Sequence, residues 1–278
     1  MNNPIITLTS DFGTKDYFVS AAKGRIYKEL PNAHVVDISH KITPFSINET
    51  AYVIKNAYKH FPKGTVHIIA VDAEWSIENK HYVFLLDDHY FICANNGIIS
   101  LITRVLQPKK VIEITLPRNT ENSYFLENFI SAACHISRGG SLNLIGKDTN
   151  NVKQLTEITP VVNKEKNQII GNVIYIDNFG NIITNIEKDL FKRIGQGRKF
   201  ELHARSYIFT KIQDRYNEIA NLEIAFEKRN DDGKRLALFN SDNYLEIAVY
   251  KSNLKTVGGA SSLLGLNYRD SVTLRFFD

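Results

Sequence analysis

Cysteine, methionine and tryptophan are scarce in this chain of 278 residues, which contains two, one and one of them respectively. Cys93 and Cys134 both lie in apolar surroundings, with neither a Cys-x-x-Cys spacing nor a metal-ligand spacing to histidine. We therefore interpret them as buried thiols in a reducing compartment, not as a disulfide or a zinc site.

Long apolar runs and a strong charge of either sign are also missing. No apolar stretch approaches the roughly 20 residues that span a membrane, and the chain does not begin with a basic segment followed by an apolar one. The net charge is +4, from 34 basic and 30 acidic residues, without a basic run interleaved with aromatics. We expect a soluble, cytoplasmic protein that binds neither membranes nor nucleic acid.

The chain has no internal repeat and no low-complexity tract. Asp11-Phe12-Gly13 matches a short kinase motif, but the Gly-rich loop, strand lysine and His-Arg-Asp segment of a protein kinase do not precede it. With 43% hydrophobic and 23% charged residues, the composition is that of a globular protein with real cores. The length predicts one large domain or two of ordinary size.

Residues 9–24 are the stretch around which we interpret the rest. An apolar β-branched run at 5–9 predicts a buried first strand, and apolar positions from Tyr17 to Leu30 recur at helical spacing. A polar loop with Asp11 and Asp16 joins the two elements. In open α/β sheets ligands bind beyond the carboxyl ends of such strands, where Asp11 would suit a ribose diol.

The following residues continue in the same strand and helix pattern. We predict strands at 33–38, 66–71 and 111–114, a hairpin of 82–86 with 90–93, and helices at 46–58, 98–105 and 129–136. Ser46 and Glu49 have the spacing of a capping box. The pattern predicts an α/β domain with a central, mostly parallel sheet over residues 1–163.

From about Pro160 the pattern changes to short β runs separated by turns. These runs lie at 169–176, 182–185, 199–204, 223–226, 236–239, 244–250 and 271–277. Evenly spaced short strands predict a smaller, β-barrel-like domain over residues 168–278.

Four segments, at 9–24, 176–186, 240–248 and 260–266, occur in the order of one family's motifs. The most specific is Asp177-Asn178-Phe179-Gly180-Asn181, followed by Thr184-Asn185-Ile186. Together they resemble the S-adenosylmethionine (SAM) hydroxide adenosyltransferases, which are relatives of the fluorinases and chlorinases. The resemblance implies hydrolysis of SAM to adenosine and methionine by attack of water on C5′. It further implies a homotrimer with each site at a subunit interface, SAM as a small-molecule substrate, and no cofactor or metal.

The resemblance also implies roles for individual residues. Asp11 would bind the ribose hydroxyls, Asp16 and Asp177 the ammonium group, and Asn181 the adenine edge, whose donor and acceptor an asparagine can match. Phe45 would form an aromatic wall for the sulfonium cation. Ser241, Tyr244 and Glu246 of the C-terminal motif complete the substrate-binding set.

Each residue also has a structural interpretation. Asp11 and Asp16 are residues that commonly cap a helix, and Asp177, Asn178 and Asn181 are common in turns. Phe45 and Trp75 are types that pack in cores. Tyr244 and Glu246 alternate along a strand, so they can face solvent. The joint occurrence of the motifs favours SAM over these alternatives.

The water-handling groups are where the sequence departs from the family pattern. Asp72 is retained after the third strand, but the family's arginine position holds Asn79, and its histidine position aligns with Tyr124. We place Asp72, Asn79 and Tyr124 at the catalytic position, with Lys80 or Glu74 as possible helpers of Asp72. The alternatives are a non-catalytic protein that binds SAM or adenosine, and a structural trimer whose pocket is vestigial.

Overall fold

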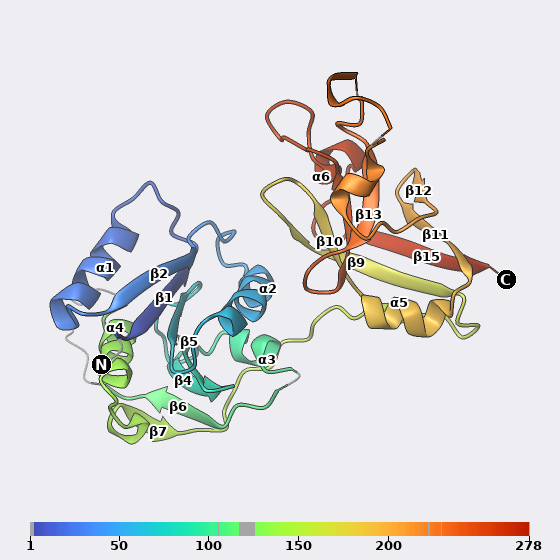
Figure 1. The fold of residues 1–278 in the computed structure, drawn as a ribbon. Helices are drawn as coiled ribbons and strands as arrows, with labels where there is room; N and C mark the ends of the chain where they lie inside the picture. Colours follow the sequence, from blue (N-terminus) through green and yellow to red (C-terminus); the bar gives the residue numbers. More distant parts are fainter. Residues whose placement is uncertain (1–2, 105, 117–125, 222, 229, 278) are drawn as a thin grey trace. The chain divides into compact units, whose positions relative to one another are not determined.

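The computed structural model describes residues 3–104, 106–116, 126–221, 223–228 and 230–277. The chain divides into two compact units, Met1–Glu157 and Ile158–Asp278, coloured blue to green and yellow to red in Figure 1. Each unit has its own sheet and its own hydrophobic core.

The first unit is built on a sheet whose described strands follow the order β2-β1-β3-β5-β4-β6-β7. β1 pairs in parallel with β2 and β3, and β3 pairs in parallel with β5, while β4 and β7 run antiparallel to their neighbours. This confirms the mostly parallel α/β sheet. The strands are β1 Ile5–Ser10, β2 His34–Ser39, β3 Val66–Ala70, β4 His81–Leu86, β5 His89–Ala94, β6 Lys110–Ile114 and β7 Gly146–Asp148.

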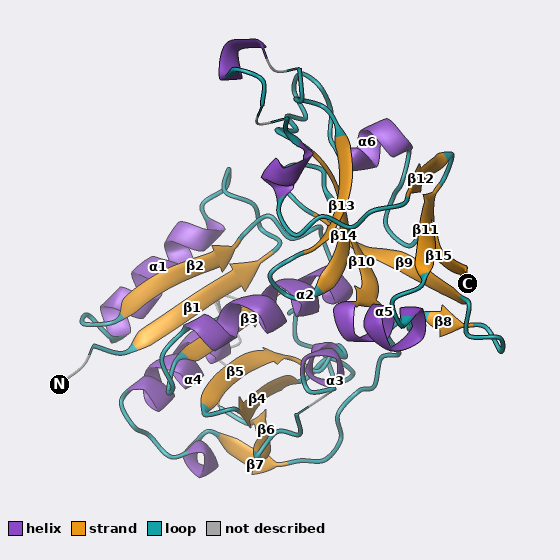
Figure 2. Cartoon of the chain, turned by 45° about the vertical axis from the view of Figure 1, so that its right-hand side comes forward, coloured by secondary structure: helices purple, strands orange, loops and turns teal. Residues whose placement is uncertain are grey.

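Helices cover both faces of this sheet, as the purple helices around the orange strands in Figure 2 show. α1 (Phe18–Glu29) and α4 (Glu127–Ser137) pack on one face, and α2 (Ile47–Ala57) and α3 (Ile98–Ile102) pack on the other. Successive residues of a strand point to opposite faces. Val83 and Ile92 accordingly join the first core, whereas Phe84 and Phe91 join the second. This double burial explains the continuous apolar runs of the central strands.

The start of α2 differs in detail from the sequence prediction. Ser46 is the N-cap residue, as expected, but its side chain makes no cap hydrogen bond, so the predicted capping box is wrong. The Ser46 N–H already donates to the Thr43 carbonyl at 3.0 Å. The Glu49 carboxylate therefore accepts from the Thr43 N–H, at 3.1 Å, instead of returning to Ser46.

The predicted hairpin of β4 and β5 is confirmed. Asp87 and Asp88 form its two-residue turn with φ of 49° and 62°. Positive φ at both central residues is the requirement of the turn that matches the twist of the paired strands, and aspartate tolerates it better than most residues. Asp88 also pairs with Lys63 and Lys109, and these contacts hold its pKa at about 2.

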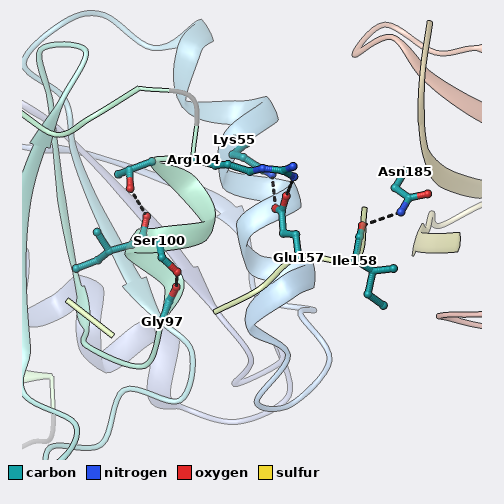
Figure 3. A network of polar contacts seen from close by, with 9 residues as sticks. Lys55, Gly97, Ser100, Arg104, Glu157, Ile158 and Asn185 are labelled. Atoms are coloured by element: carbon teal, nitrogen blue, oxygen red, sulfur yellow. Dashed lines mark hydrogen bonds and ion pairs between the residues drawn. The ribbon is translucent and has the colours of Figure 1, made fainter. Parts of the chain in front are cut away.

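The division between the units falls at one peptide bond (Figure 3). Glu157 accepts hydrogen bonds from Lys55 at 2.9 Å and from Arg104, both in the first unit. The next residue, Ile158, accepts one at 2.7 Å from the Asn185 amide in the second unit. Residues after 158 join the second unit because β8 (Val161–Val162) pairs with β9. The observed division therefore comes earlier than the boundary expected at 163.

The second unit is an antiparallel, barrel-like sheet with the strand order β12-β11-β15-β9-β10-β14-β13, and β8 pairs with β9 outside this path. The strands are β8 Val161–Val162, β9 Gln168–Ile176, β10 Ile182–Glu187, β11 Lys199–Ala204, β12 Tyr207–Phe209, β13 Arg235–Phe239, β14 Tyr244–Val249 and β15 Ser271–Phe277. The helices α5 (Lys188–Gly195) and α6 (Ala260–Leu264) were not expected from the sequence.

The strand predicted at 223–226 is wrong. In the described part of this segment the chain makes local turns, with Ile224 N–H near the Asn221 carbonyl and Lys228 N–H donating to Ala225. Ile224 is exposed, and a short 3₁₀ helix, Phe226–Lys228, follows. A four-residue apolar pattern is too short to identify a strand without a pairing partner.

Candidate active site

The carboxyl edge of the first unit's sheet holds Asp11 and Asp72. β1 and β3 are adjacent and parallel, with Ser10 directly opposite Ala70. Asp11 is the first residue after β1, and Asp72 is the second residue after β3. Two carboxylates therefore leave neighbouring strands at the same edge, which is where open α/β sheets bind ligands.

Asp11 is tied to the loop that follows β2. Its Oδ2 accepts a hydrogen bond of 2.9 Å from the backbone N–H of Phe45, while the carboxylate stays partly exposed. The capping alternative for Asp11 and Asp16 is wrong, since the N-cap residue of α1 is Tyr17 and it has no side-chain cap bond. Asp16 itself is exposed on the loop before the helix.

A buried polar chain lies directly behind Asp11. The Ser10 hydroxyl is 2.7 Å from Nδ1 of His40, and Nε2 of His40 is 3.0 Å from the Asp37 carboxylate, which also pairs with Lys23. Burial raises the Asp37 pKa, but its bonds with Lys23 and His40 outweigh that effect and hold the pKa below its usual value.

This chain has the composition of a Ser-His-Asp triad but not its accessibility. Ser10 is 2% exposed and His40 is 6% exposed, so the hydroxyl cannot reach an external electrophile. The His40 carbonyl also accepts a 2.7 Å bond from the Gly13 N–H. We conclude that the chain fastens the loop of Asp11 to the end of β2 and is not a nucleophilic site.

Exposed aromatic and apolar side chains stand on the loops at this edge. Phe45 is 72% exposed, Tyr17 69%, Trp75 37% and Ile77 80%. The core alternatives for Phe45 and Trp75 are therefore wrong. Phe45 also has a φ of 62°, which its bond to Asp11 helps to hold. An aromatic face in this position can pack against a ligand or a cation.

The loop after β3 orients the groups expected to handle water. Asp72 has a φ of 46° and is partly buried. Asn79 turns its amide nitrogen to the carbonyls of Asp72 and Glu74, at 3.0 and 2.9 Å. Lys80 pairs with Glu113 at 2.8 Å, so its ammonium is engaged away from Asp72. Tyr124 lies outside the described residues.

In the second unit, the signature turn between β9 and β10 is organised by Asp177. Its Oδ1 accepts from the N–H groups of Phe179 and Asn181, both at 2.8 Å, and its Oδ2 accepts from the Asn181 amide at 3.0 Å. These bonds support the turn interpretation of Asp177. Because an ionised carboxylate has about four acceptor sites, a further donor can still bind.

Asn181 combines a structural contact with an unused acceptor. The residue is 5% exposed, and within the described residues its Oδ1 has no hydrogen-bond partner. A buried acceptor without a donor costs about 1–3 kcal/mol, so this atom is suited to receive one from a ligand. An amine on a planar base would be such a donor.

Gly180 fixes the shape of this turn. Its φ is 77°, and a Cβ there would lie 2.9 Å from the Cα of Gly259. The Gly180 carbonyl accepts from the Ser261 N–H at 2.9 Å, and the Phe179 carbonyl accepts from the Ser252 hydroxyl at 3.1 Å. The signature turn and the start of α6 therefore pack backbone to backbone, which only glycine permits.

Glu246 is 3% exposed on β14, so the solvent-facing alternative for it is wrong. Tyr216 donates to its carboxylate at 2.6 Å. Burial raises the Glu246 pKa, and the nearby charge of Asp177 raises it further. Tyr244 is half-buried, and Ser241 is exposed in the turn before β14, which the Asn240 side chain closes.

Sequence reasoning missed several partners of the predicted residues. Tyr216 lies 30 residues before Glu246 without any motif, so nothing in the sequence relates the two. Asn96, whose amide donates to the Asp72 carbonyl, is a missed partner that does have a sequence signal. It lies in the Asn95-Asn96-Gly97 turn, which is recognisable after the hairpin. The structure brings Asp11, Phe45 and Asp72 to one sheet edge in the first unit, and Asp177, Asn181 and Glu246 together in the second.

Comparison with known proteins identifies the class to which this arrangement belongs. Residues 6–146 match the SAM hydroxide adenosyltransferase N-terminal domain, and residues 171–273 match the corresponding C-terminal domain. The chain therefore belongs to the SAM hydroxide adenosyltransferase family.

Individual relatives agree with this assignment. The chain is 32% identical to the (R)-S-adenosyl-L-methionine hydrolase of Methanocaldococcus jannaschii, over 97% of this chain and 95% of that relative. It is 24% identical to a fluorinase of an Actinoplanes species, over 72% of this chain and 77% of the relative. Among solved structures, an uncharacterized conserved protein of Thermotoga maritima has a TM-score of 0.80 at 26% identity, covering 98% of this chain and 99% of that one.

The described residues contain no group of three His, Cys, Asp or Glu side chains arranged to hold a metal ion. Among the helices that are described, none has the length and apolarity needed to cross a lipid bilayer.

Proposed function

We propose that this protein is a SAM hydrolase, which forms adenosine and L-methionine by attack of water on C5′. The observation that carries the proposal is family membership over both units together with the position of Asp11 and Asp72 after two adjacent parallel strands, at one sheet edge. The named hydrolase that is 32% identical over nearly the whole chain supports the same reaction.

The substrate contacts follow from the chemistry of each side chain. Asp11 has one carboxylate oxygen beyond its bond to Phe45, and a carboxylate accepts both hydroxyls of a ribose. The unpartnered Oδ1 of Asn181 accepts from the adenine amine. Asp16 and Asp177 attract the ammonium of the methionine moiety, and the exposed ring of Phe45 faces the sulfonium.

In the proposed reaction Asp72 holds the attacking water. The water oxygen forms a bond to C5′ as the C5′–S bond breaks, the electron pair leaves on sulfur as a neutral thioether, and the proton passes to the Asp72 carboxylate. Because the leaving group is already good, in-line positioning and exclusion of other water supply much of the rate.

We also propose a cytoplasmic homotrimer in which each site is completed by a second subunit. The support is the family resemblance and the division of binding determinants between two units, with Ser241, Tyr244 and Glu246 in the second. A ring of three subunits requires a heterologous interface that closes on itself.

A second candidate is a protein that binds SAM or adenosine with weak or no turnover. One observation favours it: the amide of Asn79, the residue that the resemblance aligns with the family's arginine, is bonded to backbone carbonyls, while Lys80 pairs with Glu113. Neither side chain offers a cation to the water that Asp72 would hold.

The test is incubation of the full-length protein with SAM in water enriched in ¹⁸O, with chromatography and mass spectrometry of the products. The hydrolase proposal predicts methionine together with adenosine that carries ¹⁸O at its 5′ hydroxyl. Asp72→Asn should lower kcat about 10²–10⁴-fold, the usual contribution of a positioned acid or base, and leave the affinity for adenosine nearly unchanged.

Asp87→Asn is the matched control, because Asp87 lies in the β4–β5 turn, where asparagine is also favoured. Its activity should equal that of the wild type. If SAM binds but adenosine appears no faster than in buffer, the binding-protein candidate is correct.

A further inference from the structure

Four consecutive carbonyls after β3 all accept hydrogen bonds from side chains. The amide of Asn96 donates to Val71 and Asp72 at 3.0 and 3.1 Å, and that of Asn79 donates to Asp72 and Glu74 at 3.0 and 2.9 Å. Nε2 of His81 donates to Ala73 at 2.9 Å. We call Asn79, His81 and Asn96 the carbonyl clamp.

The three donors come from separate places, and two of them, Asn96 and His81, are held by further contacts. Asn79 lies in the loop, His81 begins β4, and Asn96 lies in the turn between β5 and α3. Oδ1 of Asn96 accepts from the Ile98 N–H at 3.1 Å, which fixes its amide plane. His81 contacts a carbonyl, which can only accept, so its Nε2 carries the proton, and its ring packs against Phe129 at 4.4 Å.

The clamp has a backbone conformation to maintain. Asp72 has a φ of 46°, a conformation that few non-glycine residues adopt, although aspartate tolerates it better than most. Residues 71–80 contain no glycine, so the loop holds this conformation without the residue that adopts it most readily. Such strain persists only where surrounding contacts over-determine it.

We propose that the carbonyl clamp consists of positioning residues that hold Asp72 in its left-handed conformation and so aim its carboxylate at the attacking water. This inference rests on the proposed hydrolase function. It gives Asn79 a different role from the catalytic one expected of the arginine position, because its amide acts on the backbone of Asp72 and not on water. The bonds of the clamp hold a left-handed conformation that glycine would adopt without strain.

Asn96→Asp tests the clamp by removing only the donor half of the side chain. The carboxylate can still accept from Ile98 N–H, but it faces the Val71 and Asp72 carbonyls without a proton to donate. We expect kcat for SAM to fall at least tenfold while KM stays within twofold of wild type. A purely structural residue would change melting temperature without this split.

The neighbouring Asn95→Asp is the matched control. Asn95 is 7% exposed, its Oδ1 accepts from Lys153 N–H at 2.9 Å, and its amide donates to the Asn151 carbonyl at 2.9 Å, away from Asp72. It loses the same kind of buried bond, so its melting temperature should fall similarly. Its kcat per folded protein should equal that of wild type.

A double variant separates action through Asp72 from direct action. In the Asp72→Asn background, Asn96→Asp should cause no further loss of kcat, since residues that act as a unit are not additive. An unchanged kcat in the Asn96→Asp single variant would overturn the proposal. So would a loss of kcat in the Asp72→Asn background as large as the loss in the wild-type background. If Asn96→Asp does not fold, Asn79→Asp at its half-buried position tests the clamp through the bonds to the Asp72 and Glu74 carbonyls.

A crystal structure of the Asn96→Asp variant adds a measurement that needs no turnover. We expect residue 72 to leave positive φ or to adopt two conformations, and a single conformer that keeps its φ near 46° would refute the clamp. If the wild type releases no adenosine, the hydrolase proposal fails, while this structure still decides whether the clamp holds Asp72.

Discussion

Asp11 uses Oδ2 to hold the backbone of Phe45, and its Oδ1 is the atom proposed for the ribose. Asp11→Ala should therefore weaken adenosine and SAM alike, by about 2 kcal/mol or roughly 30-fold in Kd, the loss of charge-assisted hydrogen bonds. Part of this effect comes from releasing Phe45. Isothermal titration calorimetry with both ligands measures it, and unchanged affinity for adenosine would remove Asp11 from the site.

Asp16 provides the complementary prediction at the residue scale. It is exposed on the loop before α1, and its proposed partner is the ammonium of the methionine moiety, which adenosine lacks. Asp16→Ala should weaken SAM severalfold more than adenosine in the same calorimetric experiment. Equal losses for the two ligands would mean that Asp16 does not contact the amino-acid part.

At the scale of elements, the apolar central strands of the first unit contain two buried histidines, His67 on β3 and His89 on β5. Nδ1 of His67 is 2.8 Å from the Thr7 hydroxyl, and its Nε2 is 3.2 Å from Nδ1 of His89. Tyr58, Phe61 and Phe91 enclose His67. Burial, with the charge of His89, lowers the pKa of His67 to about 3, and burial also lowers the pKa of His89.

This depressed pKa predicts loss of stability in mild acid. Above the unfolded value of about 6.5 both states of His67 are neutral, and below it only the unfolded state binds the proton, so stability falls as pH falls from 6.5 towards 3. Between pH 7 and pH 5 the effect is about 2 kcal/mol. Urea unfolding of wild type and His67→Gln at both pH values measures this difference. From pH 7 to pH 5, the free energy of unfolding should decrease less in the variant than in the wild type.

His60→Gln is the control for this measurement, because His60 is exposed at the end of the 3₁₀ helix after α2. It should retain the wild-type pH dependence. A wild-type and a His67→Gln protein with the same decrease in stability would show that His67 is not the titrating group.

At the scale of the whole molecule, the proposed trimer predicts a mass of three chains of 31.7 kDa. Sedimentation equilibrium at micromolar protein, with and without SAM, measures this mass directly. A monomer that binds SAM with full affinity would contradict a site completed by a second subunit.

The fold was predictable where the signal is local. The apolar run of β1, the hairpin turn at Asp87 and Asp88, and the change to short strands after Pro160 depend on residue type and near neighbours. The predictions that failed concerned groups for which several hydrogen-bond or pairing partners compete. Glu49 has the capping spacing, but a second acceptor had already taken the Ser46 N–H, and the described part of 223–226 makes local turns instead of the predicted strand.

The sequence alone determined the family, the alternation of strand and helix, and the chemical types at the site, including Asp11, Asp72 and Asn181. Only the tertiary structure decided which of these side chains are already engaged: Asp177 in its own turn, Glu246 buried under Tyr216, and Asn79 on the backbone of Asp72. A motif identifies functional residue types that lie close together in the sequence. Burial and hydrogen-bond partners depend on elements that meet only after folding, as Asn96 meets Val71 and Asp72 across 24 or more residues.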